Sequence, residues 1–147
     1  MKFRPLVLAF AFLLPALPAA FILPALPARA DPILTLDHGA VWQTLKDGED
    51  TQGFIQIHNT GDAADTLTAA NCTIAASTSL VDAGGSPLQS LVIPPGQTVT
   101  LSSAGAHLLL TAARYMVAKN GILPCAFTFS QSGQLIGYLN SVNPPKS

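Results

Sequence analysis

The chain has little charge for its length. Only 10% of its 147 residues are Asp, Glu, Lys or Arg, against about 25% in an average soluble domain. The seven basic and eight acidic residues nearly cancel, which gives a formal net charge of −1. Without a basic excess, the sequence lacks the electrostatic footprint of a nucleic-acid-binding protein. Apolar residues make up 49%, which excludes a disordered chain and is sufficient for the core of a single domain.

The sequence also lacks the motifs of common catalytic sites. It contains no G-x-S-x-G, no H-E-x-x-H and no glycine-rich phosphate loop. Its three histidines and eight acidic residues are scattered along the chain, and their spacing indicates no acid–base pair. We therefore expect a protein that is not an enzyme.

The first 30 residues differ in composition from the rest. Lys2 and Arg4 precede an apolar stretch over residues 5–27, and an A-x-A sequence follows at 28–30. This order is typical of a secretory signal peptide that is cleaved before Asp31. The apolar stretch is long enough to span a bilayer, so an uncleaved membrane anchor is the alternative. The prolines within the stretch and the cleavage sequence favour removal of the peptide.

Cleavage changes the charge and sets the location of the protein. Loss of the three basic residues in this segment leaves four basic and eight acidic residues, a net charge of −4. We expect a periplasmic protein with no membrane attachment, since no cysteine follows the cleavage sequence for lipidation. The chain then consists of the signal peptide (1–30), one domain (31–142) and a flexible tail (143–147).

Short apolar or alternating runs, each stopped by turn residues, recur about every ten residues. This regularity predicts an all-β sandwich of the immunoglobulin-like kind, with seven to nine short strands, rather than alternating helices and strands. In the run at 53–59, Ile55 and Ile57 share one face, and His58 lies on the other. The segment 114–119 is the one candidate for a short helical turn. The predicted strands are 33–36, 40–44, 53–59, 66–75, 88–93, 98–101, 107–113, 122–130 and 134–142.

Three stretches together resemble a known family. They are GFIQIHNTGDAAD at 53–65, IPPGQTVTL at 93–101 and GAHLLL at 105–110. In order and spacing they are similar to the periplasmic copper chaperones of the PCu(A)C type, and the likeness covers most of residues 35–140. The resemblance implies a small cupredoxin-like β-sandwich that holds Cu(I) outside the cytoplasm. It also implies delivery of the copper to cuproproteins, chiefly cytochrome oxidase.

The copper ligands of that family are two histidines and two methionines, because thioether sulfur and imidazole suit the soft Cu(I) ion. The resemblance assigns the second histidine to His107. The methionine that follows it corresponds to Leu109, which has no donor atom. The region of the first histidine, 77–82, contains neither His nor Met, and the methionine expected near 85–90 is absent. One ligand of four, His107, is therefore kept.

Three other residues are considered as supplementary ligands. Met116 is the only methionine after the signal peptide, nine residues beyond His107, and is either a ligand or a core residue. His58 lies beside a turn and is either a ligand or an ordinary surface histidine. His38 follows Asp37 near the start of the mature chain, and we expect it to be solvated.

Cys72 and Cys125 are the only cysteines. An even number in an oxidising compartment favours a disulfide, which here would close a loop of about fifty residues. Cys125 shares the face of its strand with Phe127 and Phe129, so it is expected to point inward. The alternative is a copper site made of both thiolates and His107.

Two functions remain open at this point. The first is a copper carrier in which His107 binds copper together with Met116, His58 or a ligand from the recipient protein. The second is a metal-free sandwich that acts as a periplasmic interaction or structural module. A carrier predicts a second ligand close to His107, whereas a module predicts an isolated His107 and an exposed apolar patch.

Overall fold

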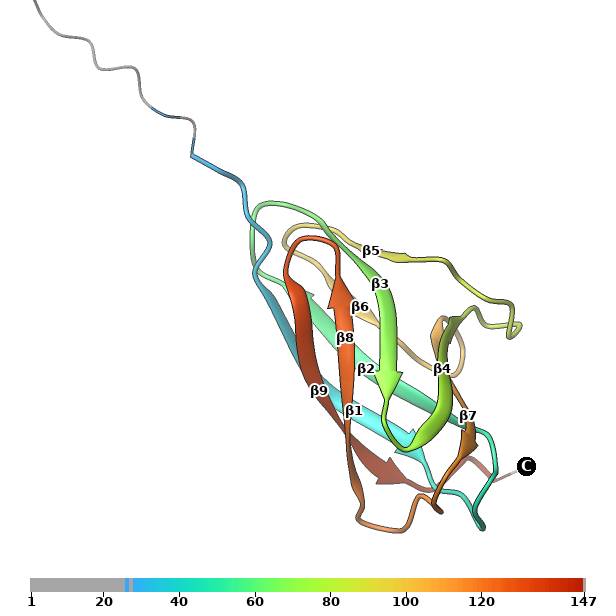
Figure 1. Cartoon of the computed structure of the whole chain (residues 1–147). Coiled ribbons are helices and arrows are strands. Elements are labelled where there is room, and N and C mark those ends of the chain that lie inside the picture. Colours follow the sequence, from blue (N-terminus) through green and yellow to red (C-terminus); the bar gives the residue numbers. More distant parts are fainter. Residues whose placement is uncertain (1–25, 27, 147) are drawn as a thin grey trace, which may run out of the picture.

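The computed structural model describes residue 26 and residues 28–146, so the predicted signal peptide lies almost entirely outside the described residues. The described part is all-β, as predicted, and no helix in it qualifies as a membrane span. Figure 1 shows its nine strands: β1 (Leu34–Trp42), β2 (Thr51–Asn59), β3 (Asp65–Cys72), β4 (Ala75–Val81), β5 (Leu91–Ile93), β6 (Thr98–Thr100), β7 (His107–Ala113), β8 (Ile122–Phe129) and β9 (Gly133–Val142).

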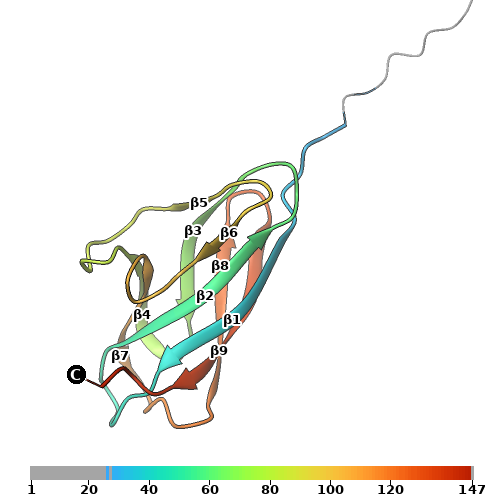
Figure 2. The same cartoon turned by 180° about the vertical axis from the view of Figure 1, so that it is seen from behind.

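The strands form one sheet that curls into two layers. Its order is β4-β7-β2-β1-β9-β8-β3-β5, and the short β6 pairs with β2. β1 and β9 are parallel, whereas the other pairs are antiparallel. The sheet curls until β3 comes next to β4, where the N–H of Cys72 donates to Thr78 Oγ1 at 3.0 Å. Figures 1 and 2 show the two layers from opposite sides, and the predicted sandwich class is confirmed.

The core lies between the two layers and follows from the alternation of apolar residues along the strands. In β2, Ile55 and Ile57 are buried, whereas Phe54, Gln56 and His58 lie on the outer face, as predicted. Full burial of one aliphatic or aromatic side chain contributes about 1.5–3 kcal/mol to the stability of the fold. The buried side chains between the layers therefore hold the two layers together. The other strands supply mainly Leu67, Leu108, Leu110, Leu123, Phe127, Phe129 and Leu139.

The predicted disulfide between Cys72 and Cys125 is present, and it lies within one layer. The two residues are direct partners on β3 and β8, with Cα atoms 4.2 Å apart, and both are buried. No described cysteine is free. The alternative copper site of two thiolates and His107 is therefore not available in this oxidised form.

Several elements differ from the prediction. The run at 66–75 is divided between β3 and β4, because the chain turns at Thr73 and Ile74. The segment 114–119 is not helical. Its backbone donors bind distant side chains instead: the N–H of Met116 donates to Asp47, and that of Val117 donates to Thr44.

The predicted runs 33–36 and 40–44 are joined in one strand, β1, which contains a bulge. The register with β2 shifts between Asp37 and Ala40, and His38 has a φ of 49°. Gly39 sits so close to β9 that a Cβ on it would run into the carbonyl oxygen of Tyr138. The bulge is thus fitted to the neighbouring strand.

Candidate functional site

His107 begins β7 and is nearly buried, with 4% of its surface exposed. Its Nδ1 atom lies 2.9 Å from the carbonyl oxygen of Gly105. A carbonyl oxygen only accepts, so this contact assigns the proton to Nδ1 and the lone pair of the neutral ring to Nε2. Metal-bound histidines are usually oriented in the same way, with the second ring nitrogen donating to a carboxylate, a backbone carbonyl or water. His107 therefore has a tautomer that is suited to a metal.

An aromatic ring packs beside His107, and a hollow lies next to its neighbour Leu109. The ring of Phe54 lies 6.3 Å from that of His107, and Trp42 packs edge-on against Phe54 at 5.2 Å. Leu109 lies two residues after His107, so both side chains project from the same face of β7. Leu109 lines a hollow of about 260 Å³ together with Trp42 and Gln52. The position of the family's methionine is thus occupied by an apolar side chain beside open space.

Met116 lies beyond the opposite end of β7. The strand from His107 to Ala113 spans about 20 Å, and Met116 follows in the next loop. The N–H of Met116 donates to Asp47 Oδ1 at 2.6 Å, which fixes this backbone beside the β1–β2 loop. The structure does not bring Met116 and His107 together.

His58 lies on the same outer face as His107 but farther along β2. Gly53 pairs with Leu108, which puts His107 level with Phe54. His58 is four residues beyond, or about 13 Å along the strand. Metal–ligand bonds of about 2.0–2.3 Å keep two ligand atoms within about 4.6 Å of each other. The structure therefore does not bring His58 and His107 together as ligands of one ion.

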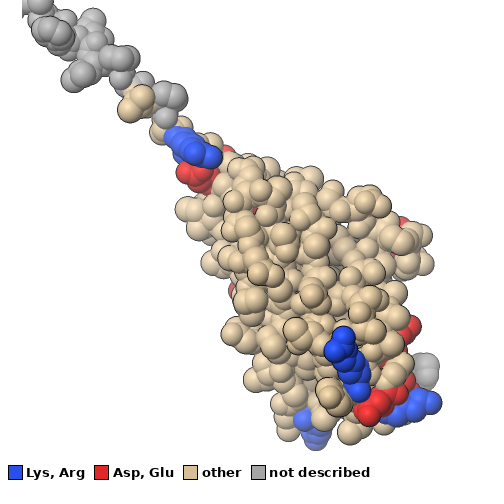
Figure 3. All heavy atoms as spheres, viewed as in Figure 1, with Lys and Arg blue, Asp and Glu red and all other residues tan. Residues whose placement is uncertain are grey.

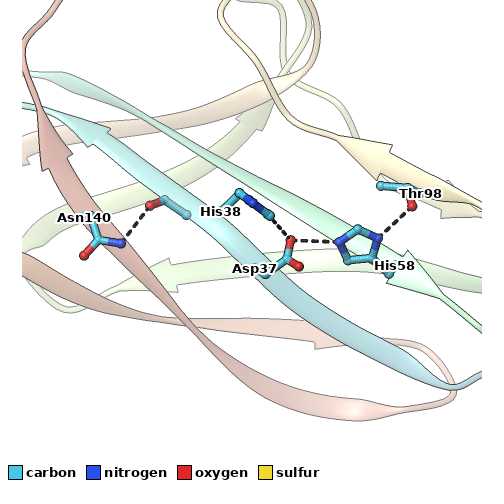
Figure 4. Close-up of polar contacts among 6 residues, drawn as sticks. Asp37, His38, His58, Thr98 and Asn140 are labelled. Carbon is cyan, nitrogen blue, oxygen red and sulfur yellow. Dashed lines mark hydrogen bonds and ion pairs between the residues drawn. The ribbon is translucent and has the colours of Figure 1, made fainter.

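His58 is instead part of a polar cluster at β1, β2 and β6. Its Nε2 lies 2.8 Å from Asp37 Oδ1, and its Nδ1 lies 2.7 Å from Thr98 Oγ1. His38 Nδ1 lies 2.8 Å from the same oxygen of Asp37. Hydrogen bonds from His38 and His58 lower the pKa of the Asp37 carboxyl below its ordinary value. Figure 4 shows these contacts.

The sequence prediction missed this cluster. His38 is exposed, as expected, but it is bonded to Asp37 rather than free in solvent. Ligand atoms of Asp37, His38 and His58 all lie within 4.8 Å of one another, and they form the only such group of His, Cys, Asp or Glu in the described part. The only signal in the sequence was that Asp37 and His38 are adjacent. That His58 lies beside them follows from the pairing of β1 with β2, which the sequence does not specify.

The sequence matches the family model described as lipoprotein LpqE-like over residues 34–136. No curated protein matches it. Among solved structures, the apo PCuAC domain from PmoF1 is 26% identical, with a TM-score of 0.67, covering 76% of this chain and 94% of that one.

Two copper-loaded structures share the fold at lower identity. The copper-bound PCuAC domain from PmoF2 is 18% identical, with a TM-score of 0.68 over 76% of this chain and 93% of that one. The Cu(I) form of DR1885 from Deinococcus radiodurans is also 18% identical, with a TM-score of 0.61 over 81% of this chain and 84% of that one. On the family match and the shared fold, this chain belongs to the LpqE-like family and is a PCuAC-type domain.

Proposed function

We propose that the protein is a periplasmic copper carrier that holds Cu(I) reversibly through His107 and passes it to a cuproprotein. The observation that supports this most is the contact of His107 Nδ1 with the Gly105 carbonyl at 2.9 Å. It leaves Nε2 as the donor atom, on the residue that resembles the one ligand kept from the PCu(A)C set. The copper-bound form of the PmoF2 domain, which has the same fold, is consistent with this cargo.

A single protein ligand suits transfer better than storage. Cu(I) is a soft ion that prefers thioether, thiolate and imidazole ligands, and His107 supplies only one of these. Met116 lies in the loop beyond the far end of β7, a strand about 20 Å long, and His58 lies about 13 Å farther along β2. The remaining ligands would then come from the recipient, so that copper is held by both proteins during exchange and leaves with the one that offers more donors.

The ring of His107 is suited to such an exchange because its position is fixed before copper arrives. It is nearly buried, anchored to Gly105 and lies beside Phe54. A prepositioned ligand loses little conformational freedom on binding. The hollow beside Leu109, Trp42 and Gln52 provides space for a side chain of the recipient.

A Cu(I) competition titration of the oxidised protein tests this function. We compare the wild type with His107→Gln, and we use His58→Gln as the matched control on the same outer face. We expect the wild type and His58→Gln to take up one equivalent in the presence of a recipient-like thioether peptide, and His107→Gln to lose it. Equal binding by all three proteins would refute a copper role for His107.

Two observations favour a second function, that of a metal-free interaction module. The first is that neither Met116 nor His58 lies beside His107, and the second is an exposed apolar patch. Ile122, Ile136 and Tyr138 project from β8 and β9 and are 52–63% exposed. Figure 3 shows few charged side chains on this side of the molecule, and these gather mainly at its edges. Failure of the copper titration together with an intact fold would leave this apolar surface as the functional candidate.

A further inference from the structure

The bulge in β1 brings two consecutive polar side chains together. In a regular strand, successive side chains project to opposite faces. Here the register shift between Asp37 and Ala40, with His38 at a φ of 49°, breaks that alternation. As a result, His38 Nδ1 lies 2.8 Å from Asp37 Oδ1. Bulges commonly re-aim side chains in this way next to functional sites.

The bulge that brings Asp37 and His38 together lies within the sheet and is fixed by contacts with β9. Gly39 packs against the backbone of Tyr138, where no Cβ would fit. The side-chain amide of Asn140 donates to the carbonyl oxygen of Gly39 at 3.4 Å (Figure 4). Both partners belong to β9, so the parallel pairing of β1 with β9 holds the bulge.

His58 completes the cluster from β2. It pairs with Thr35 of β1 on one side and with Thr98 of β6 on the other. Its Nε2 faces Asp37 Oδ1 at 2.8 Å, and Thr98 Oγ1 contacts its Nδ1 at 2.7 Å (Figure 4). Three strands therefore fix two imidazoles around one carboxylate oxygen.

The charge of this carboxylate has no permanent counterion. Within the described residues, the only basic side chains within 4.0 Å of the Asp37 carboxylate are His38 and His58, which are charged only when protonated. The side chains of Asp37 and His38 are 47% and 72% exposed, respectively, so solvent reaches the group. An incoming cation thus meets a carboxylate and two imidazoles, and no described Lys or Arg nitrogen lies within 4.0 Å of that carboxylate.

We propose that Asp37, His38 and His58 bind a divalent transition-metal ion, Cu(II) or Zn(II), at a site separate from His107. Two imidazoles and a carboxylate are typical ligands for these ions, whereas soft Cu(I) prefers sulfur. Four-coordinate geometry with bonds of about 2.0–2.1 Å places ligand atoms about 3.3 Å apart. The present atoms lie within 4.8 Å of one another, so small rotations of two exposed side chains suffice. Water fills the fourth position.

Binding requires a change of tautomer but no net loss of a proton from the neutral rings. Both ring nitrogens that face Asp37 now donate to its oxygen. When the metal takes His58 Nε2, the proton of that ring moves to Nδ1, which then donates to Thr98 Oγ1. In His38 the metal takes Nδ1, and the proton moves to Nε2, which faces solvent. Thr98 thereby acts as a positioning residue that fixes the orientation of the His58 ring.

Titration with Cu(II) or Zn(II) alone tests the proposal. The wild type is compared with His58→Gln and His38→Gln, and His107→Gln is the matched control outside the site. We expect one equivalent of each ion to bind the wild type and His107→Gln. The two site variants should bind at least about tenfold more weakly, since loss even of a supporting partner costs 10–100-fold. Equal affinity in all four proteins, or a loss confined to His107→Gln, would overturn the site.

Two spectroscopic readouts distinguish this site from a merely structural cluster. The Cu(II) form should give an electron paramagnetic resonance spectrum with hyperfine coupling to two nitrogens, reduced to one in His58→Gln. Zn(II) should shift the ¹⁵N resonances of His38 Nδ1 and His58 Nε2. Thr98→Val should weaken Zn(II) binding, while Zn(II) should still shift both ¹⁵N resonances. An unchanged Zn(II) affinity in this variant would show that Thr98 does not position His58. Because Cu(I) at His107 is measured separately, this proposal can fail without affecting the proposed function.

Discussion

Cys72 and Cys125 face each other directly across β3 and β8 and are joined by a disulfide. Both sulfurs are buried between the two layers of the sandwich. The strongest Cu(I) ligands of the chain are thereby removed from metal chemistry. The three histidines of the chain, which supply its imidazole ligands, are divided between two separate places on the outer face of the sheet.

The disulfide is expected to contribute strongly to stability. It joins residues 53 positions apart, and closing a loop of this length stabilises the folded state by about 4 kcal/mol on the chain-entropy model. Urea unfolding of the Cys72→Ala/Cys125→Ala double variant should show a loss of that size. A reducing agent should destabilise the wild type and leave the double variant unchanged. Equal unfolding midpoints for both proteins would contradict this account.

Asp65 should make the protein sensitive to acid. Burial raises the pKa of its carboxyl, but hydrogen bonds from the Ser132 side chain and from backbone N–H groups of Gln131, Thr66 and Ser132 outweigh burial and lower this pKa to about 2. The ordinary value is 3.8. A lowered pKa contributes stability above about pH 4, and this contribution is lost as the pH falls towards 2.

The free energy of unfolding, measured against pH, tests this role. The shift corresponds to about 2 kcal/mol, which the Asp65→Asn variant should lack at neutral pH. The stability difference between wild type and variant should then shrink between about pH 4 and pH 2. A difference that stays constant down to pH 2 would show that the charge of Asp65 is not responsible.

Leu109→Met should strengthen Cu(I) binding. The side chain at this position lies on the same face as His107, beside the hollow, so a thioether there provides the soft ligand that the site lacks. We expect at least about a tenfold gain in Cu(I) affinity (1.4 kcal/mol), measured by competition with a chromophoric chelator. Leu109→Ile, which adds no sulfur, is the matched control. A gain in both variants, or in neither, would argue against His107 as the neighbouring ligand.

Gly39→Ala should disturb the bulge of β1. The added Cβ would run into the carbonyl oxygen of Tyr138 on β9, and overpacking of this kind typically costs about 1–3 kcal/mol. Thermal unfolding should show the loss, while Gly84→Ala, which meets only Asp82 Oδ1 at 3.4 Å, should be close to neutral. If Gly39→Ala were as stable as the wild type, the bulge would not depend on contact with β9.

Cleavage after Ala30 should give an exported chain that begins at Asp31. The backbone N–H of Asp31 donates to Asp62 Oδ1 at 3.1 Å, so cleavage would place a new ammonium group beside this carboxylate. Intact mass spectrometry of the protein recovered from the periplasm measures the first residue directly. A mass that includes residues 1–30 would instead support the uncleaved anchor.

The strands that could be predicted from the sequence are those marked by local patterns, namely the alternation of apolar residues and the turn residues between strands. The alternation of Ile55 and Ile57 specified β2, and β7 occupies the predicted residues 107–113. Residues 94–97 form a turn in which the N–H of Gln97 donates to the Pro94 carbonyl at 3.4 Å and Gly96 has a φ of 67°, as Pro and Gly at these positions favour. The division between β3 and β4 was missed because Thr73-Ile74 contains neither Gly nor Pro, the usual turn residues.

The candidate sites were harder to predict, because they depend on strand pairing. The sequence identified His107 and His58 as candidates but not the distance of about 13 Å between them, which follows from the register of β2 with β7. It also left His38 as a solvated residue. Asp37 lies on the same side as His58 through the register of β1 with β2. Only the bulge, which is held by contacts from β9, turns His38 towards them.

The most direct test of the copper role is to observe the ring nitrogens of His107 while Cu(I) is added. In ¹⁵N NMR spectra of the oxidised protein with the same thioether peptide, assigned with His107→Gln and His58→Gln, one equivalent of Cu(I) should shift Nε2 of His107. Nδ1 should remain protonated and bonded to Gly105, and the signals of His38 and His58 should stay unchanged. Unchanged His107 signals, or a shift confined to His38 and His58, would contradict the proposal that this domain carries Cu(I) on His107.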